Sequence, residues 1–449
     1  MWYSGNAPAG KQLRLELQQR LEEGYIVPDE LKKSIEAVTD DSPNESFRIA
    51  YDALAHLSKD PAFRFVEPST LEEIREARPA SRMKAATLPY DREELLNRYH
   101  GAWLGRCVGC ALGKPVETMG MWEGGHRAIR TYLEMRGDWP LRDYFSNAKM
   151  DGSSKLICPQ STRENIGFME SDDDIRYTLI GMMIFERFGK DFTSHQIAEL
   201  WHETLTLGQV FTAERQALLN YGVYLNALPA EFFDPEFTST FNNPYREWIG
   251  AQIRADFFGF MAPGNPEKAA EYAWRDACWT HRKNGIYGAM FIAAMEAAAF
   301  VTSAPEKLIQ AGLGEIPENC RLAYEIRELM KVIPKYSDMD EFMEYMDKRF
   351  ATMSPVHTIN NAIICAAALF YGKMIPERCV CEAVVAGLDT DCNGATVGAI
   401  TGIAAGFRDF GGTLAGRLNN LIKSEMLAFG DIRISEVTRR TLALYEKLA

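Results

Sequence analysis

The sequence predicts an all-α fold. Across most of its 449 residues, 47% of which are hydrophobic, apolar side chains recur at helical spacing. There is no convincing strand alternation and no repeat of fixed period. Length alone allows one large domain or two to three smaller ones. The uniform helical pattern after residue 90 favours one all-α domain over 91–449, preceded by an N-terminal helical extension over 1–90.

The extension divides into two parts. Residues 11–58 are charged and carry apolar side chains at helical spacing, with breaks at Pro28 and near Pro43. Residues 59–90 contain four prolines among charges, which suits a linker or a short helix with extended flanks. The sequence leaves open whether the extension caps the main body or mediates assembly.

Asp91 opens the first helix of the main domain, and acidic residues follow it near the positive end of the helix dipole. Glycines at positions 101, 105, 109 and 113 occupy every fourth residue of this helix. Each glycine costs about 1 kcal/mol of helix propensity relative to alanine. Four on one stripe predict that a neighbouring helix or a ligand approaches the backbone closely.

Residues 120–170 are rich in glycine and proline and lack periodicity, which predicts a long functional loop. Its aromatic side chains are candidates for stacking on a flat ligand group: Trp122, Tyr132, Trp139, Tyr144 and Phe145. Beyond this loop the pattern predicts helices over 172–188, 194–207, 211–226, 245–258, 266–277, 285–301, 319–333, 339–350, 359–371, 376–386, 394–407 and 415–445.

Composition excludes several function classes. The net charge of −13 argues against a nucleic-acid-binding surface. No basic amphipathic stretch indicates a membrane surface, and the most apolar segments are too short to span a bilayer. Residues 1–10 do not resemble a secretory signal. Nine cysteines without a disulfide-scaffold pattern favour a reducing, cytoplasmic setting, and Cys107 with Cys110 lacks partners at zinc-finger spacing.

Two acidic clusters, each at the start of a predicted helix, are the most informative chemical signal. Ser171 is a suitable N-cap for Asp172, Asp173 and Asp174, and Asp389 and Asp391 precede Cys392 and a helix of small apolar residues. If the fold brings the clusters together, their oxygens suit hard cations such as Mg²⁺ or Mn²⁺. The alternative for each cluster is an ordinary polar helix start, which is common for a sequence such as Ser171 to Asp174.

Three further residues carry weaker signals. Glu117 follows the glycine-striped helix and could act as a general base or hold a substrate, although an exposed or salt-bridged glutamate has the same pattern. His281 and Asn284 precede the helix predicted over 285–301, where a capping or core role is the simpler interpretation.

Taken together, segments 101–117, 170–175 and 387–396 resemble the ADP-ribosylglycohydrolase family in order, spacing and local context. The resemblance covers roughly 91–430 and implies a compact, orthogonal multi-helix bundle that holds two Mg²⁺ ions, with Mn²⁺ as an alternative. It implies metal ligands at Ser171, Asp172, Asp173, Asp389, Asp391 and Cys392. We assign catalytic roles to Glu117, Asp173 and Asp391, and substrate binding to Gly109, Asp174, His281 and Asn284.

The resemblance also implies the reaction. We expect a Mg²⁺-dependent hydrolase that cleaves a glycosidic bond of an ADP-ribose conjugate or a related riboside, with a small molecule or an ADP-ribosylated protein as substrate. Two positions depart from the family pattern: Cys392 stands where a hydroxyl residue is usual, and Cys110 where many members carry aspartate. A non-catalytic ADP-ribose-binding protein and a two-metal phosphohydrolase are the alternatives.

Overall fold

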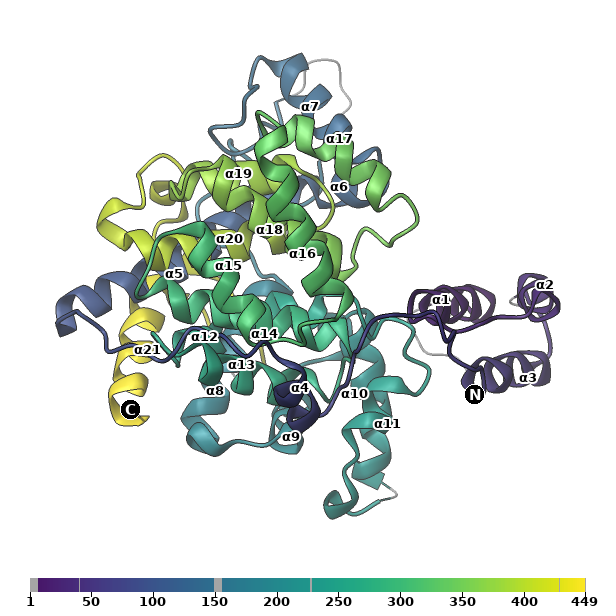
Figure 1. Ribbon diagram of the computed structural model, residues 1–449. Helices are drawn as coiled ribbons and strands as arrows, with labels where there is room; N and C mark the ends of the chain where they lie inside the picture. Colours follow the sequence, from purple (N-terminus) through teal and green to yellow (C-terminus); the bar gives the residue numbers. More distant parts are fainter. Residues whose placement is uncertain (1–6, 40, 149–155, 227, 428, 449) are drawn as a thin grey trace.

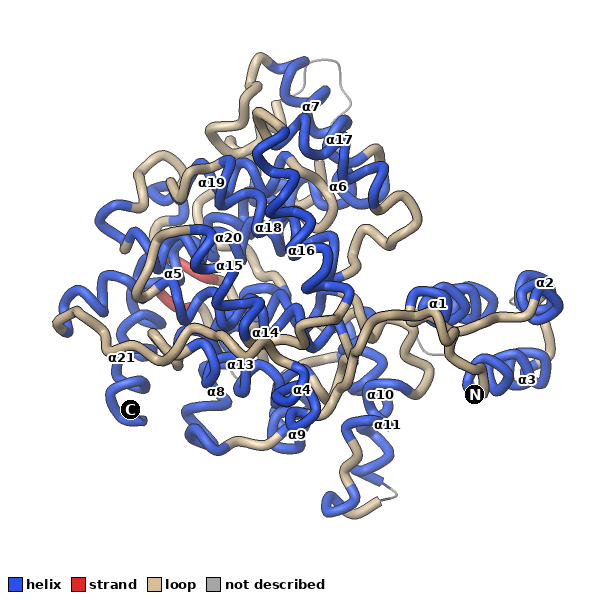
Figure 2. The backbone as a smooth tube through the Cα atoms, viewed as in Figure 1, coloured by secondary structure: helices blue, strands red, loops and turns tan. Residues whose placement is uncertain are grey.

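The computed structural model describes residues 7–39, 41–148, 156–226, 228–427 and 429–448. Helices account for nearly all of its regular structure (Figures 1 and 2), which confirms the predicted all-α class. Within the described residues the strands are β1 (Leu421–Ile422) and β2 (Ile432–Arg433), which pair antiparallel. Part of the segment considered for a secretory signal, and residues 149–155 of the expected loop, lie outside the described residues.

The α-helices follow one another along the whole chain. In the extension they are α1 (Ala9–Glu22), α2 (Asp29–Ala37), α3 (Asn44–Ala55) and α4 (Leu71–Ala77). In the main domain they are α5 (Arg92–Gly113), α6 (Glu117–Trp122), α7 (Gly125–Arg136), α8 (Asp173–Phe188), α9 (Ser194–Thr204), α10 (Thr212–Asn226), α11 (Pro235–Thr240), α12 (Asp256–Phe260), α13 (Pro266–Ala277), α14 (Asn284–Ala299), α15 (Pro305–Gly314), α16 (Arg321–Val332), α17 (Met339–Arg349), α18 (Thr358–Tyr371), α19 (Pro376–Val385), α20 (Thr390–Ala405) and α21 (Ile434–Leu448).

Several predicted elements were wrong in detail. The helix predicted over 415–445 begins only at Ile434, because Asn419 and Asn420 adopt left-handed backbone angles that end the preceding short turn. Residues 245–258 form a 3-10 helix, η6 (Ile249–Arg254), followed by α12. Helix α15 was not predicted, and α6 and α7 occupy the start of the expected loop, separated by a glycine pair with positive φ.

The centre of the molecule is a close packing of α5 against α20 (Figure 1). Glycines of one helix face glycines of the other along the contact. A Cβ atom added to any of them would collide with the facing backbone. A Cβ on Gly101 would lie 2.1 Å from the carbonyl oxygen of Gly402, and one on Gly105 would lie 2.0 Å from that of Gly398. The close approach predicted for the glycine stripe is therefore made by a helix.

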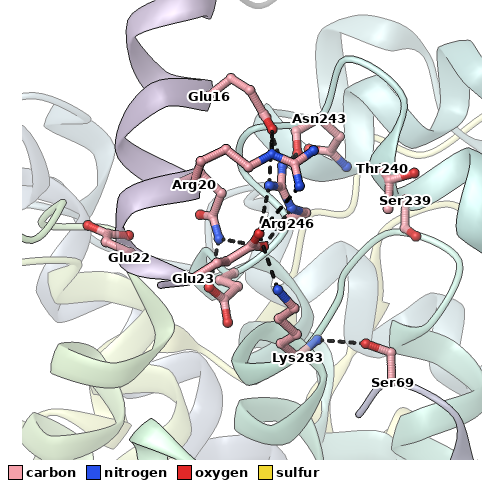
Figure 3. A network of polar contacts seen from close by, with 12 residues as sticks. Glu16, Arg20, Glu22, Glu23, Ser69, Ser239, Thr240, Asn243, Arg246 and Lys283 are labelled. Carbon is pink, nitrogen blue, oxygen red and sulfur yellow. Dashed lines mark hydrogen bonds and ion pairs between the residues drawn. The ribbon is translucent and has the colours of Figure 1, made fainter. Parts of the chain in front are cut away.

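Helices α1, α2 and α3 have a small core of their own, whereas Leu71 and Ile74 of α4 belong to the main core. Buried Leu13, Phe47 and other apolar side chains hold α1, α2 and α3 together, beside the main body (Figure 1). Polar groups attach α1 to the main body: Glu16 and Glu23 form ion pairs with the guanidinium of Arg246 at 2.8 and 2.9 Å (Figure 3). All three side chains are almost fully buried, so α1 is attached by an ionic clasp.

Among the described residues, no helix combines the length and the apolar character that crossing a membrane requires.

We expect Gly105→Ala to destabilise the fold by about 3 kcal/mol, because its methyl group would collide with backbone that cannot rotate away. Urea unfolding measures the loss. Gly222→Ala is the matched control: it lies within α10, nothing is within 4 Å of an added Cβ, and we expect a gain of about 1 kcal/mol. Equal stability of the two variants would contradict the packing role.

We expect Arg246→Met to cost about 3–5 kcal/mol, because it removes the main partner of two buried carboxylates. Unfolding by urea, together with limited proteolysis of residues 7–60, measures the effect. Arg48→Met removes ion pairs on the exposed face of α3 and should leave both measurements unchanged. A stable, protease-resistant Arg246→Met protein would show that the clasp is dispensable.

Candidate active site

The two acidic clusters meet in one cavity of about 520 Å³. The end of α5, the start of α8 and the start of α20 bring their residues to it. The residues that line it are Lys114, Glu117, Met121, Trp122, Ser171, Asp172, Asp173, Arg176, Phe211, Thr212, Glu214, Trp248, Ile249, Gly250, Ile253, Val356, Asp389, Asp391 and Cys392. Seven of the eleven residues assigned from the sequence therefore face a common space.

The α5–α20 contact fixes the geometry of this junction. The hydroxyl of Thr390, the first residue of α20, donates to the carbonyl oxygen of Gly113 at the end of α5, at 2.9 Å. The peptide N–H of Asp389 is held by the Asn361 side chain at 3.3 Å. Asp389 occupies the N-cap position of α20 without making a capping hydrogen bond. Its carboxylate is therefore left for the cavity.

The start of α8 differs from the sequence expectation by one residue. Asp172, rather than Ser171, is the N-cap, and its Oδ1 accepts a hydrogen bond from the Asp174 N–H at 3.0 Å. The hydroxyl of Ser171 donates to the carbonyl oxygen of Ser424 at 2.9 Å and accepts from Arg176 Nη1 at 2.6 Å. Ser171 thus already has two partners within the protein.

Lys114, which the sequence analysis did not single out, is the main cation of the site. Its Nζ lies 2.9 Å from Asp172 Oδ2 and 2.7 Å from the Ser171 carbonyl oxygen. Burial lowers the pKa of Lys114, but Asp172 outweighs it and the pKa lies above its usual range. Burial likewise opposes ionisation of Asp172, yet Lys114 and Arg176 hold its pKa below the ordinary value. Lys114 and Asp172 therefore form a buried ion pair in which both groups stay charged.

The remaining carboxylates lack such partners. Glu117, Asp173, Asp389 and Asp391 line the cavity, and none forms an ion pair with the part of the chain described by the structure. The charge of Asp391, followed by burial, raises the pKa of Glu117 to about 10. Burial and Asp172 raise the pKa of Asp391 to about 6. Carboxyl groups without a cationic partner are therefore concentrated where the three helix ends meet, and their mutual repulsion favours protonation.

The donor atoms fit a divalent cation. Oxygens of Asp389 and Asp391 and the sulfur of Cys392 lie within 4.8 Å of one another, as do donor atoms of Cys110, Asp172, Asp174 and Asp391. The Oδ1 of Asp389 has no hydrogen-bond partner among the described residues, although only 5% of the residue is exposed. A buried, unsatisfied carboxylate oxygen is typical of a site that binds a cation.

None of the four residues assigned to substrate binding lines the cavity. Gly109 packs against Gly394, whose carbonyl oxygen would lie 1.9 Å from an added Cβ, and Asp174 is fully buried beside Arg106. His281 lies behind the cavity wall, 3.8 Å from Glu214, and burial lowers its pKa well below the usual range. Asn284 donates to the buried carboxylates of Glu67 and Glu247.

Of the aromatic side chains expected to stack on a ligand, Trp122 lines the cavity. Tyr132, Tyr144 and Phe145 are buried in the core, and Trp139 packs against Arg130. The other aromatic walls, Phe211 and Trp248, were missed. No local pattern identifies them, because only the tertiary fold brings their segments to the acidic clusters.

The fold and the site together define a helical protein with a buried carboxylate centre. A family model described as ADP-ribosylglycohydrolase matches residues 91–443, and the chain belongs to this family. A solved structure, an ADP-ribosylglycohydrolase-related protein complex, superposes with a TM-score of 0.51 over 80% of this chain and 100% of that chain. At 19% sequence identity this likeness concerns the fold alone. No curated protein matches the sequence.

The raised pKa of Glu117 predicts that the protein, kept metal-free by a chelator, loses folding stability as the pH rises. The folded protein keeps Glu117 protonated up to about pH 10, whereas the unfolded chain ionises it near its ordinary value of 4.5. Folding therefore takes up a proton, and stability falls as pH rises through that window. Glu117→Gln should remove this loss, so its advantage over wild type grows by at most about 1.4 kcal/mol per pH unit.

Urea unfolding at several values between about pH 5 and about pH 9 measures this trend. Glu123→Gln, an exposed acid just after the same short helix, should follow the wild-type profile. A Glu117→Gln profile parallel to that of wild type would contradict the assignment.

Proposed function

We propose that this protein is a cation-dependent hydrolase that cleaves a glycosidic bond of an ADP-ribose conjugate or a related riboside. The observation that carries the proposal is a set of carboxylates in one cavity, half-buried Glu117 with buried Asp389 and Asp391, that form no ion pair with the described residues. At about 520 Å³ the cavity falls within the usual range for small-molecule sites. Membership of the ADP-ribosylglycohydrolase family supports this reaction class.

Asp389 and Asp391 are the residues we expect to hold a divalent cation, which would polarise ligand hydroxyls or a water molecule when bound. Hydrolysis forms a bond from a water oxygen to the anomeric carbon as the bond to the leaving group breaks. Glu117 is our candidate for carrying the proton between water and leaving group. Asp173, beside it, would orient the water or a ribose hydroxyl. The products are free ADP-ribose, or its riboside counterpart, and the protonated acceptor.

The cavity edge supports binding of a planar group. Trp122 and Phe211 line the cavity yet remain 60% and 49% exposed. Large aromatic side chains at a cavity edge offer a surface that a base such as adenine can cover. We propose that they contact the nucleotide part of the ligand, while the carboxylates face the scissile bond.

One observation favours a second candidate, a non-catalytic ADP-ribose-binding protein. Lys114 neutralises Asp172, one of the expected metal ligands, and so withdraws it from metal binding. A two-metal phosphohydrolase remains the third alternative, distinguished by release of inorganic phosphate. The leaving group, Mg²⁺ as the cation and a cytoplasmic location stay predictions.

We expect arginine-, serine- or acetyl-linked ADP-ribose conjugates, or simple ribosides, to release their acceptor in the presence of Mg²⁺ or Mn²⁺ and not in chelator. Asp391→Asn and Glu117→Gln should each lower the rate by about 100-fold or more. Product chromatography measures release, and calorimetry measures ADP-ribose binding. Asp338→Asn, an exposed helix N-cap, is the matched control and should retain full activity.

The alternatives give different results in the same assays. Binding of ADP-ribose without release of any acceptor would support the non-catalytic protein, and phosphate release would support the phosphohydrolase. Release that persists in chelator and in Asp391→Asn would overturn the proposed role of the carboxylates.

A further inference from the structure

We propose that this chain holds one divalent cation, bound by Asp389, Asp391 and Cys392, and that the Lys114 ammonium replaces a second cation beside Asp172. The proposal deepens the cation-dependent function proposed above and rests on it. It differs from the two ions that the family resemblance implies. Its basis is the distribution of cationic side chains between the two groups of donor atoms in the cavity.

The side-chain oxygens of Ser171 and Asp172, near the start of α8, already have protein partners. Both oxygens of Asp172 are used, Oδ2 by Lys114 at 2.9 Å and Oδ1 by the Asp174 N–H at 3.0 Å. The Ser171 hydroxyl is shared between Arg176 and a carbonyl oxygen. A cation that bound Asp172 would compete with an ammonium group for the same carboxylate, and the two like charges would repel.

Asp174 has a cationic partner on its other side, although its Oδ2 has no hydrogen-bond partner among the described residues. Arg106 is fully buried and lies 3.4 Å from Asp174 Oδ1, while its second ion pair goes to Asp256 at 2.7 Å. The group formed by Cys110, Asp172, Asp174 and Asp391 is therefore flanked by two fixed cations, Lys114 and Arg106. Of the three carboxylates in this group, only Asp391 lacks a cationic partner within the described chain.

The aspartates at the start of α20 differ in having no cationic partner among the described residues. Asp389, Asp391 and Cys392 are at most 6% exposed, and neither aspartate has an ion pair with any residue that the structure describes. The Asp389 Oδ1 that lacks a hydrogen-bond partner belongs to this group and lies at the cavity wall. One divalent cation there balances the two aspartate charges, and Glu117 and Asp173 remain for the substrate.

The sulfur donor defines the class of ion. A thiolate is a soft ligand, so two carboxylates with one sulfur suit borderline ions such as Co²⁺ or Zn²⁺ better than Mg²⁺. Coordination by Cys392 gives Co²⁺ a sulfur-to-metal charge-transfer absorption, which oxygen donors alone do not produce. Cobalt is therefore a probe that reports the number of ions and the sulfur contact independently of catalysis.

The test is equilibrium dialysis of the metal-stripped, full-length protein against Co²⁺, with elemental analysis and absorption spectra. We expect one Co²⁺ per wild-type chain with a sulfur charge-transfer band. Lys114→Ala should bind two ions, because it exposes Asp172. Lys283→Ala, which removes a different lysine from a buried carboxylate at 3.2 Å, is the matched control and should bind one.

Two more variants locate the ion and keep the test decisive if Lys114→Ala does not fold. Asp172→Asn should still bind one Co²⁺, whereas Asp389→Asn should lower its affinity at least tenfold. Cys392→Ser should lose the charge-transfer band. The proposal would be overturned if the wild type bound two Co²⁺ ions or none. It would also be overturned if a folded Lys114→Ala variant bound only one ion, or if Asp172→Asn bound none.

The release assay above separates this inference from the proposed function. One bound Co²⁺ without release of any acceptor would leave the single-ion site standing and remove the hydrolase. Release by a protein that binds two ions per chain would establish the hydrolase and reject the role of Lys114.

Discussion

The contact of helix backbone against helix backbone between α5 and α20 is the constraint on which the rest of the structure depends. Opposed glycines let the two helices approach until a single methyl group would collide with a carbonyl oxygen. That approach places the end of α5, with Lys114 and Glu117 just beyond it, beside the first turn of α20. The close packing of these two helices therefore brings their ends together at the site.

The junction of helix ends places several acidic side chains close together in the interior of the protein. Burying a carboxylate is unfavourable unless a cation or hydrogen bonds compensate. The protein supplies Arg106 for Asp174 and Lys114 for Asp172, yet it leaves Asp389, Asp391 and Glu117 without a counter-ion in the described chain. This unequal neutralisation distinguishes a ligand site from a structural ion-pair network such as the clasp on α1.

Helix α1 is connected to this site through a short segment of the main body. Arg246 lies in the clasp with Glu16 and Glu23, and Glu247 accepts from Gln19 of α1 (Figure 3 shows the clasp). The next residues, Trp248 to Gly250, form part of the cavity wall. The extension and the ligand-facing surface therefore share a continuous stretch of backbone.

The sequence by itself determined the helical class, the glycine stripe and the two acidic helix starts, because helix periodicity, capping and propensity are local properties. The resemblance carried by the same segments added the family, which the family model confirms. Only the tertiary structure decided which helix the glycine stripe packs against, which carboxylates pair with a lysine or arginine side chain, and which aromatic side chains reach the cavity. Lys114, Phe211 and Trp248 carry no local signal, since their roles arise from contacts between residues far apart in the chain.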